Sequence, residues 1–234
     1  MWTCLAAPPF SDAKPLLAHS GSPYIDYTGW FQRSVNWPVG RSLHIGMPRT
    51  APLSSANLPL DRSVVLVGMM GAGKTAVGRR LAAVLDWPFT DADSAIEEAA
   101  GTTIANIFAE IGEAAFREQE RRVIARLLRG GRQVLALGGG AFMDPETRAL
   151  IRERAISIWL RADPDTLLKR TSRRNDRPLL ATPDRRATLT ALLAERTPVY
   201  AEADLVVDSS QGPLKVVVGR VLEALASHLD EASP

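Results

Sequence analysis

The chain of 234 residues has one cysteine and three histidines, and this scarcity excludes several kinds of chemistry. Cys4 alone cannot form an internal disulfide, and His19, His44 and His228 do not give the Cys/His spacing of a metal site. The central region also offers no Cys/His or Ser/His/Asp combination for covalent catalysis. The nucleophile of any reaction is therefore predicted to belong to a substrate.

Other patterns are missing as well. The sequence has no apolar run that suggests a membrane span, no apolar heptad run that suggests a coiled coil, and no N-K-x-D segment that would read guanine. The net charge of +2 is too small to argue for nucleic acid as a partner. We expect a cytoplasmic monomer with neither membrane nor nucleic-acid partners.

Residues 1–60 differ from the rest of the chain, because frequent prolines interrupt every helix or strand pattern. We interpret this stretch as an N-terminal extension that is mostly disordered. A translation start at Met47 is one alternative, which would make the upstream residues dispensable. A docking segment is another, since Trp2, Trp30 and Trp37 are unusual in disordered sequence.

The clearest motif is Gly68-Met69-Met70-Gly71-Ala72-Gly73-Lys74-Thr75, which matches the phosphate-loop pattern G-x-x-x-x-G-K-[ST]. It follows the apolar run 64–67 and precedes a helical pattern. The backbone N–H groups of such a loop and the start of its helix bind polyphosphate, Lys74 reaches the outer phosphates, and the Thr75 hydroxyl binds Mg²⁺. A chance glycine-rich turn is the alternative. We predict a nucleotide site here.

From residue 61 onward, short apolar runs alternate with helical periodicity. The expected strands cover residues 63–67, 88–91, 134–137, 155–160 and 205–207. The expected helices cover residues 74–85, 94–99, 104–128, 145–154, 164–171 and 185–201, followed by a closing helix. Repeated βα units predict an α/β fold of three αβα layers, in which a central parallel sheet of about five strands has helices on both faces.

Ligands of such sheets bind at the carboxyl ends of the strands. The second strand ends in Asp91-Ala92-Asp93, and in an extended segment both carboxylates would lie on one side. One could help to hold Mg²⁺, and the other could accept a hydrogen bond and a proton from a substrate hydroxyl. Alternatively, Asp93 caps the following helix. The third strand ends in Gly138-Gly139-Gly140, where backbone can approach a ligand, or which is only a loose turn.

With these motifs the chain resembles the shikimate kinases over about residues 61–230. The segments that carry the resemblance are the phosphate loop with Gly78-Arg79-Arg80-Leu81-Ala82, Phe89-Thr90-Asp91-Ala92-Asp93, Ile107-Phe108, Gly112-Glu113, Phe116-Arg117-Glu118-Gln119-Glu120, Leu137-Gly138-Gly139-Gly140-Ala141, Arg177-Pro178-Leu179-Leu180 and Glu195-Arg196-Thr197-Pro198-Val199-Tyr200. The resemblance implies a P-loop kinase fold with a mobile lid at about 172–183. It also implies transfer of the γ-phosphoryl group of ATP to the 3-hydroxyl of shikimate.

The resemblance further implies the residues of the site. Catalysis is expected from Lys74, Asp93 and Arg177. ATP binding is expected from Gly71, Ala72, Gly73, Lys74, Thr75, Ala76, Arg170 and Arg177. Shikimate binding is expected from Asp93, Arg117, Gly138, Gly139, Gly140 and Arg196, and Mg²⁺ binding from Thr75 and Asp91.

The residue types agree with this assignment, because guanidinium binds carboxylate through two parallel hydrogen bonds and separated arginines suit an anionic substrate. Glu120, one helical turn after Arg117, could hold that guanidinium in place, although a solvated ion pair is the alternative. For Arg177 the alternative is a solvated basic loop, and for Arg170 a salt bridge at a helix end. Two other functions stay open: a kinase of another hydroxy acid such as gluconate, and a non-catalytic nucleotide-binding module.

Overall fold

The computed structural model describes residue 58, residues 60–172 and residues 184–232. The N-terminal stretch that contains Met47 lies outside these residues, and so does the predicted lid from residue 173 onward, together with Arg177. No helix in the described ranges is both long and apolar enough to cross a membrane.

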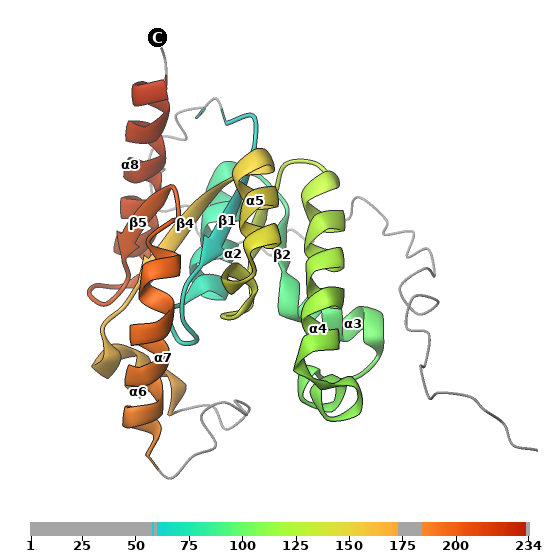
Figure 1. Ribbon diagram of the computed structural model, residues 1–234. Helices are drawn as coiled ribbons and strands as arrows, with labels where there is room; N and C mark the ends of the chain where they lie inside the picture. Colours follow the sequence, from blue (N-terminus) through green and yellow to red (C-terminus); the bar gives the residue numbers. More distant parts are fainter. Residues whose placement is uncertain (1–57, 59, 173–183, 233–234) are drawn as a thin grey trace, which may run out of the picture. The chain divides into compact units, whose positions relative to one another are not determined.

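A five-stranded parallel sheet forms the centre of the described residues (Figure 1). Its strands are β1 (Ser63–Val67), β2 (Phe89–Asp91), β3 (Val134–Ala136), β4 (Ala155–Arg161) and β5 (Leu205–Asp208). Their order in the sheet is β2-β3-β1-β4-β5, and all four pairings are parallel. Every residue of β1 and β3 is buried, as strands covered on both faces require. The predicted sheet is confirmed.

The helices agree closely with the prediction. They are α2 (Lys74–Leu85), α3 (Ala92–Ala100), α4 (Ile104–Arg129), α5 (Pro145–Arg154), α6 (Pro164–Thr171), α7 (Arg185–Tyr200) and α8 (Leu214–Ala232), with a short 3-10 helix, η1 (Ala141–Met143), after β3. Two features were not predicted: η1 itself, and a break inside α4, where Gly112 has φ 78°. A left-handed residue of this kind changes the direction of the helix axis.

Side-chain caps explain where several helices begin. The carboxylates of Asp144, Asp163 and Asp184 accept hydrogen bonds from the backbone N–H three residues later, at the starts of α5, α6 and α7. Thr103 does the same at the start of α4. A cap of this kind satisfies an N–H that has no partner within the helix, and it typically stabilises by about 1 kcal/mol.

The strand order determines which helices share a face of the sheet. The step from β1 to β2 runs toward one edge, whereas the later steps run toward the other edge. Since crossovers between parallel strands are right-handed, α2 covers one face and the helices from α3 to α7 lie on the other. The terminal helix α8 returns to the first face, where it contacts α2. The result is the predicted three-layer arrangement.

The central strand β1 lies between β3 and β4. The helix that follows β1 covers one face of the sheet, whereas the helices that follow β3 and β4 cover the opposite face. This is the switch point at which open α/β sheets bind ligands outside the carboxyl ends of their strands. The phosphate loop follows β1 at this place. The Asp91 segment and the three glycines end β2 and β3, the next strands along the same half of the sheet.

The carboxylate of Asp204 is hydrogen-bonded to β4, in the half of the sheet that contains β4 and β5. The Oδ2 atom of Asp204 accepts hydrogen bonds from Ser157 N at 2.8 Å and from Ser157 Oγ at 2.6 Å. The Asp204 N–H donates a hydrogen bond to Ser157 Oγ at 2.9 Å. Ser157 is buried in β4, one residue before the β4 ladder to β5 begins at Ile158. Asp204 thus satisfies a buried N–H that β5 does not reach.

We predict that Asp204→Ala lowers the free energy of unfolding by about 1–3 kcal/mol, because it leaves the buried N–H of Ser157 without an acceptor. Asp230→Ala, at an exposed position of α8, is the matched control and should change the value by less than about 0.5 kcal/mol. Urea unfolding followed by circular dichroism measures both. Equal stability of the two variants would contradict the prediction.

Candidate active site

The phosphate loop leads directly into a helix. Gly73, with φ 95°, is the N-cap residue of α2, and the first turn of that helix holds no acidic side chain. The positive end of the helix dipole is therefore not offset by a carboxylate of its own first turn. The Lys74 ammonium donates to the carbonyl oxygens of Gly68, at 2.8 Å, and Met69, at 3.0 Å. The loop, the helix end and the lysine together form a site for phosphate groups.

Thr75 and Asp91 meet beside this loop. The Thr75 hydroxyl donates to Asp91 Oδ2 at 2.7 Å, although the two residues come from α2 and β2. The described part of the chain contains no group of three or more His, Cys, Asp or Glu side chains that could hold a metal ion. A hydroxyl and one carboxylate fit Mg²⁺, which keeps several waters and takes further oxygens from substrate phosphates.

The prediction of an extended Asp91-Ala92-Asp93 segment is wrong. The strand β2 ends at Asp91 and α3 begins at Ala92, so Asp93 lies in the first turn of a helix. The two carboxylates face different groups: Asp91 Oδ2 accepts a hydrogen bond from the Thr75 hydroxyl, and Asp93 Oδ1 lies against Gly138. The alternative that Asp93 caps the helix is also wrong. The N-cap position belongs to Asp91, whose side chain makes no capping bond.

The glycines after β3 allow three charged side chains to approach the backbone closely. A Cβ atom on Gly138 would lie 2.5 Å from Asp93 Oδ1 and 3.0 Å from Glu120 Oε1. A Cβ atom on Gly140 would lie 2.5 Å from Arg117 Nη2. Real Cβ atoms do not occur at such distances, so a side chain at either position would displace a charged group. The triple glycine is more than a loose turn.

Arg117 is held by two carboxylates of its own helix. Its Nη1 atom lies 2.6 Å from Glu120 Oε2, and its Nη2 atom lies 3.1 Å from Glu113 Oε1. The Glu120 side chain is only 3% exposed, so the alternative of a solvated pair does not hold. The guanidinium carbon also lies 5.7 Å from the ring centre of Phe108, within the range of a cation–π contact. These contacts fix the direction of the guanidinium.

Burial raises the pKa of Glu120 above its ordinary value, and the charge of Arg117 opposes this rise. The carboxylates of Asp93 and Asp144 add to it, because a like charge disfavours ionisation. Glu120 thus connects the arginine at Gly140 with the aspartate at Gly138. The sequence spacing alone predicted only the contact of Glu120 with Arg117.

Arg196 approaches the middle glycine from α7. Its Nη1 atom donates to the Gly139 carbonyl at 3.2 Å, and the residue is 7% exposed. Its Nε atom is buried, and no atom of the described residues accepts a hydrogen bond from it. Tyr200, one turn later, also donates its hydroxyl to the Gly139 carbonyl. Burial raises the pKa of Tyr200 to about 12, so this hydroxyl remains a donor at neutral pH.

Arg170 lies beside the phosphate loop. Its Nη1 atom is 3.4 Å from the Gly71 carbonyl oxygen and 3.5 Å from that of Ala72, and its Nη2 atom donates to the Ser209 carbonyl at 2.8 Å. No carboxylate in the described ranges pairs with it in a salt bridge, so the alternative of a helix-end salt bridge is not supported. The Ser209 hydroxyl donates to the Ala72 carbonyl at 3.0 Å.

Sequence reasoning missed Ser209 and gave Tyr200 no function of its own. Ser209 follows β5, and its position at the carboxyl end of a strand was the available signal. Tyr200 closes the motif that contains Arg196, and the spacing of four residues places both on one face of α7.

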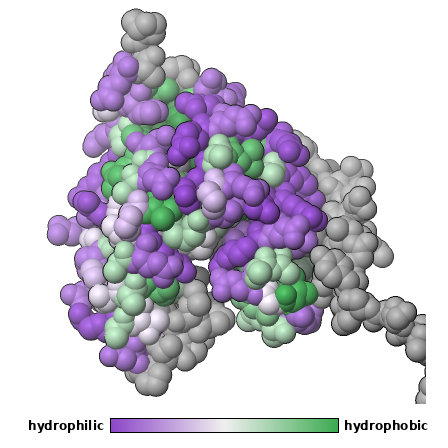
Figure 2. All heavy atoms as spheres, viewed as in Figure 1, coloured by the Kyte–Doolittle hydropathy of each residue, from purple (hydrophilic) through white to green (hydrophobic). Residues whose placement is uncertain are grey.

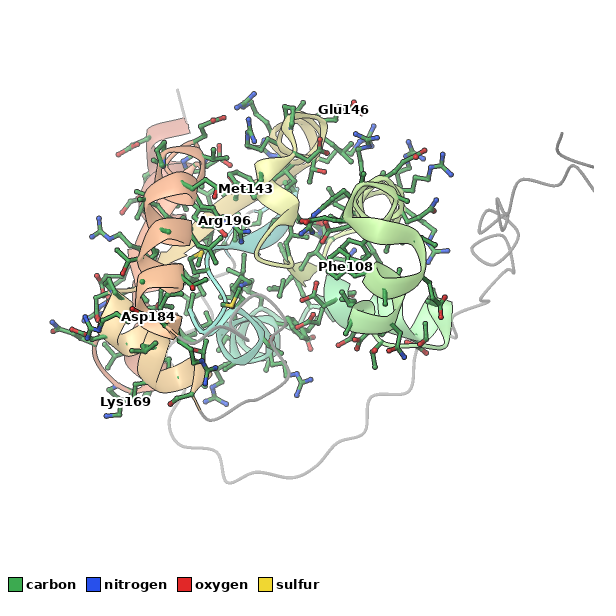
Figure 3. All side chains as sticks on the ribbon, turned by 60° about the horizontal axis from the view of Figure 1, so that its bottom comes forward. Phe108, Met143, Glu146, Lys169, Asp184 and Arg196 are labelled. Atoms are coloured by element: carbon green, nitrogen blue, oxygen red, sulfur yellow. The ribbon has the colours of Figure 1, made fainter. Side chains whose placement is uncertain are left out.

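The acceptor side of the site opens between α7 and α4. Figure 2 shows this face hollowed between the α7 side and the α3–α4 side, with hydrophilic residues along the visible rim. Figure 3 shows Arg196 on the α7 side and Phe108 on the α4 side of the opening. The two arginines at the glycine segment thus come from different helices, Arg117 from α4 and Arg196 from α7.

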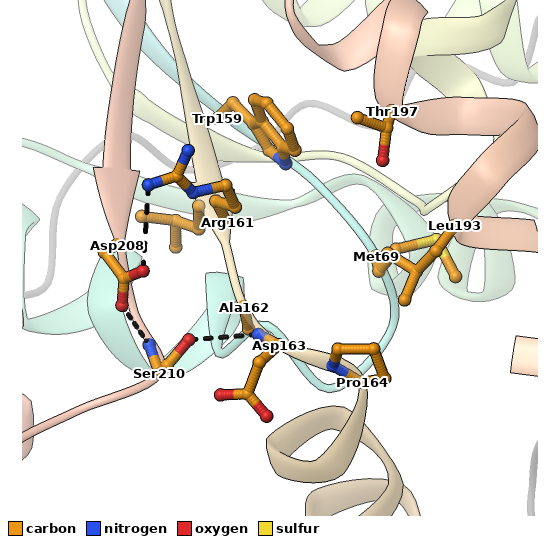
Figure 4. Close-up of a pocket in the computed structure, with 11 residues that line it drawn as sticks. Met69, Trp159, Arg161, Ala162, Asp163, Pro164, Leu193, Thr197, Asp208 and Ser210 are labelled. Carbon is orange, nitrogen blue, oxygen red and sulfur yellow. Dashed lines mark hydrogen bonds and ion pairs between the residues drawn. The ribbon is translucent and has the colours of Figure 1, made fainter. Parts of the chain in front are cut away.

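A separate cavity of about 390 Å³ lies between α7 and the carboxyl ends of β4 and β5 (Figure 4). Trp159, Leu193 and Met69 supply apolar lining, and the ion pair of Arg161 with Asp208, 3.9 Å apart, lies at its edge. None of the predicted acceptor residues lines this cavity. It adjoins the phosphate loop only at Met69.

Comparisons with known proteins agree on one family. A protein-family model described as shikimate kinase matches residues 70–226. A shikimate kinase from Bradyrhizobium diazoefficiens is 57% identical over 168 residues, which cover 72% of this chain and 81% of that protein. A solved shikimate kinase from Acinetobacter baumannii, in complex with shikimate, superposes with a TM-score of 0.70 and 37% identity and covers 74% of this chain and 97% of that chain.

The gluconate alternative has a structural counterpart. A gluconokinase from Sinorhizobium meliloti superposes with a TM-score of 0.52 over 74% of this chain and 98% of that chain. Its sequence identity is 21%, so the likeness shows a common fold alone.

We predict that replacing Glu120 with glutamine changes the pH dependence of stability in a definite direction. A carboxyl whose pKa is raised on folding stabilises fully below its unfolded pKa, and this contribution is lost as pH rises through the folded value. Glu120→Gln lacks this loss. The melting temperature of the variant minus that of the wild type should therefore increase from pH 4 to pH 7.

Thermal melts at constant ionic strength measure this difference at each pH. Glu118→Gln is the matched control, because Glu118 is 44% exposed and pairs with Arg122 on the same helix. The melting temperature of Glu118→Gln minus that of the wild type should stay nearly constant from pH 4 to pH 7. A difference for Glu120→Gln that falls with pH would show that the ion pair, and not burial, dominates at Glu120.

Proposed function

The chain belongs to the shikimate kinase family and acts as an ATP-dependent shikimate kinase; on this basis we propose that it phosphorylates the 3-hydroxyl group of shikimate. We also propose which of the side chains described above bind shikimate, bind ATP and orient the reacting groups. One observation carries the assignment of the acceptor site. Three successive glycines each lie against a different charged residue: Gly138 against Asp93, Gly139 against Arg196 and Gly140 against Arg117.

This arrangement suits a small acid with hydroxyl groups. Arg117 and Arg196 bind the carboxylate, since planar guanidinium groups match its two oxygens. The buried Nε of Arg196 supports this role, because a donor without a protein acceptor is available to a ligand. Asp93, at the other end of the glycine segment, accepts a hydrogen bond from a ring hydroxyl. The three glycines keep the space between them clear.

The nucleotide side is formed by the phosphate loop and its surroundings. The loop residues from Gly71 to Ala76 bind the phosphates of ATP, and Lys74 turns from the Gly68 and Met69 carbonyls toward the outer phosphates. Arg170 contacts the carbonyl oxygens of Gly71 and Ala72, and this position beside the phosphate loop supports its assignment to nucleotide binding.

We assign Mg²⁺ to Thr75 and Asp91. The 2.7 Å contact between their oxygens supports the pairing, and hydroxyl and carboxylate oxygens are ligands that Mg²⁺ prefers. When bound, the ion would neutralise charge on the phosphate oxygens.

Transfer of the phosphoryl group depends more on the positions of the reacting groups than on a covalent bond to the enzyme. The substrate hydroxyl oxygen forms a bond to the γ-phosphorus, the bond from that phosphorus to the bridging oxygen breaks, and its electron pair stays on ADP. Asp93 orients the hydroxyl and takes up its proton, while Lys74 stabilises charge on the transferring group. We keep Arg177 in the proposal as a further cation at this group, on the strength of its motif alone.

The same proposal includes the monomeric state, a cytoplasmic location and an N-terminal extension over residues 1–60 that precedes the kinase domain. A non-catalytic nucleotide-binding module is disfavoured, because such a module has no need for an intact acceptor side. Here Asp93, Arg117 and Arg196 all lie against the glycine segment.

The test is an ADP-release assay on the purified full chain with ATP, Mg²⁺ and either shikimate or gluconate. We expect turnover with shikimate alone, and none for Lys74→Ala, whose far-ultraviolet circular dichroism should match the wild type. Turnover with gluconate instead would overturn the assignment of the acceptor. ATP binding without turnover on either acceptor would support the non-catalytic module.

We predict that Gly140→Ala raises the KM for shikimate by about tenfold or more, because its Cβ occupies the place of the Arg117 guanidinium. The KM for ATP should change by less than about twofold, since the change lies on the acceptor side. Gly140 has φ −98°, which alanine adopts without strain, so the chain should fold.

Gly219→Ala is the matched control, because a Cβ there meets no atom within 4 Å and the residue lies inside α8. It should leave both KM values unchanged. An unchanged KM for shikimate in Gly140→Ala would remove Arg117 from the carboxylate site.

A further inference from the structure

The Gly139 carbonyl accepts hydrogen bonds from two side chains of α7. One donor is Arg196 Nη1 at 3.2 Å, and the other is the Tyr200 hydroxyl. A carbonyl oxygen has two lone pairs, so these bonds occupy both. The orientation of this one peptide group is therefore determined from the helix that carries Arg196.

The Tyr200 ring is fixed independently of its hydroxyl. Tyr200 is fully buried, and its ring stacks with those of Trp159, at 5.9 Å between centres, and Phe142, at 6.4 Å. Loss of the hydroxyl alone would leave this packing in place. Packing and hydrogen bonding at Tyr200 can thus be separated by experiment.

Arg196 also faces Tyr200 directly, since a side-chain hydrogen bond and the charge of the guanidinium act on the tyrosine hydroxyl. Its bond to Gly139 is its one hydrogen bond to the described residues at the glycine segment, and its buried Nε has no acceptor there. Arg117, in contrast, is held by Glu120 and Glu113. The direction of the Arg196 guanidinium consequently depends on the Gly139 carbonyl and on Tyr200, which also donates to that carbonyl.

The same contact reaches the phosphate loop. A Cβ atom on Gly139 would lie 3.6 Å from Met70 N and 3.8 Å from the Gly68 carbonyl oxygen, and the Tyr200 hydroxyl is 3.9 Å from Met69 Sδ. The Gly139 peptide therefore lies close to the backbone of the phosphate loop. The Tyr200 hydroxyl holds its carbonyl oxygen beside Arg196.

We propose that Tyr200 is a positioning residue, which through the Gly139 carbonyl and through its own contact with Arg196 sets the direction in which Arg196 presents its guanidinium to the shikimate carboxylate. This inference rests on the proposed function, because it uses the carboxylate role of Arg196. Tyr200 touches no reacting atom, so it acts on substrate binding and not on the chemical step.

Tyr200→Phe tests the proposal, because phenylalanine keeps the stacked ring and removes only the hydroxyl. We expect the KM for shikimate to rise by about tenfold, whereas kcat and the KM for ATP change by less than about twofold. A loss of this kind is the signature of an interaction that is equal in the ground state and the transition state.

A double-mutant cycle with Arg196→Lys separates positioning from general stability. If Tyr200 acts through Arg196, adding Tyr200→Phe to Arg196→Lys raises the KM for shikimate by less than about twofold further. Trp159→Phe is the packing control. It disturbs the ring stack and not the hydroxyl, so it should lower the melting temperature and leave the KM for shikimate within about twofold of the wild type.

Three outcomes would overturn the proposal: a KM for shikimate in Tyr200→Phe within about twofold of the wild type, effects that multiply fully in the cycle, or a Tyr200→Phe chain that does not fold. The last would assign the hydroxyl to stability. The wild-type measurement distinguishes these results from a failure of the proposed function. A wild-type chain that releases no ADP with shikimate overturns both.

Discussion

The backbone of Gly138, Gly139 and Gly140 lies so close to charged side chains that a Cβ at either end would displace one of them. This steric constraint joins three elements that are distant in the sequence. It brings Asp93 from α3, Arg117 from α4 and Arg196 from α7 to one three-residue segment at the end of β3. The sheet order then places that segment beside the phosphate loop, so acceptor and donor groups meet across the β1–β3 pair.

The acceptor side differs in how its two arginines are held. Arg117 is held by an ion pair with the buried Glu120 carboxylate, and this pair offsets only part of the cost of removing that carboxylate from water. Arg196 instead is held by the Gly139 carbonyl and by the Tyr200 side chain. A site of this kind combines a rigid guanidinium with one whose direction depends on the peptide it touches. Its selectivity for a carboxylate thus depends on backbone geometry as much as on charge.

Much of this arrangement was predictable from the sequence, and the reason is local. Strands with unbroken apolar runs and helices with aspartate caps gave element bounds within about two residues, as in Lys74–Leu85. The prediction failed where two elements join without a loop, since nothing local signals that α3 begins directly after Asp91. The bonds of Tyr200 and Ser209 to distant carbonyls were also beyond the sequence, because they depend on how helices and loops pack in three dimensions.

The position of β1 has a consequence for how the chain reaches its native state. Its partners are β3, where Val64 pairs with Val134, and β4, where Ser63 pairs with Ala155. During synthesis, β1 therefore leaves the ribosome long before either neighbour exists. The phosphate loop cannot be fixed in place until β4 emerges, and sheets with such distant pairings fold slowly.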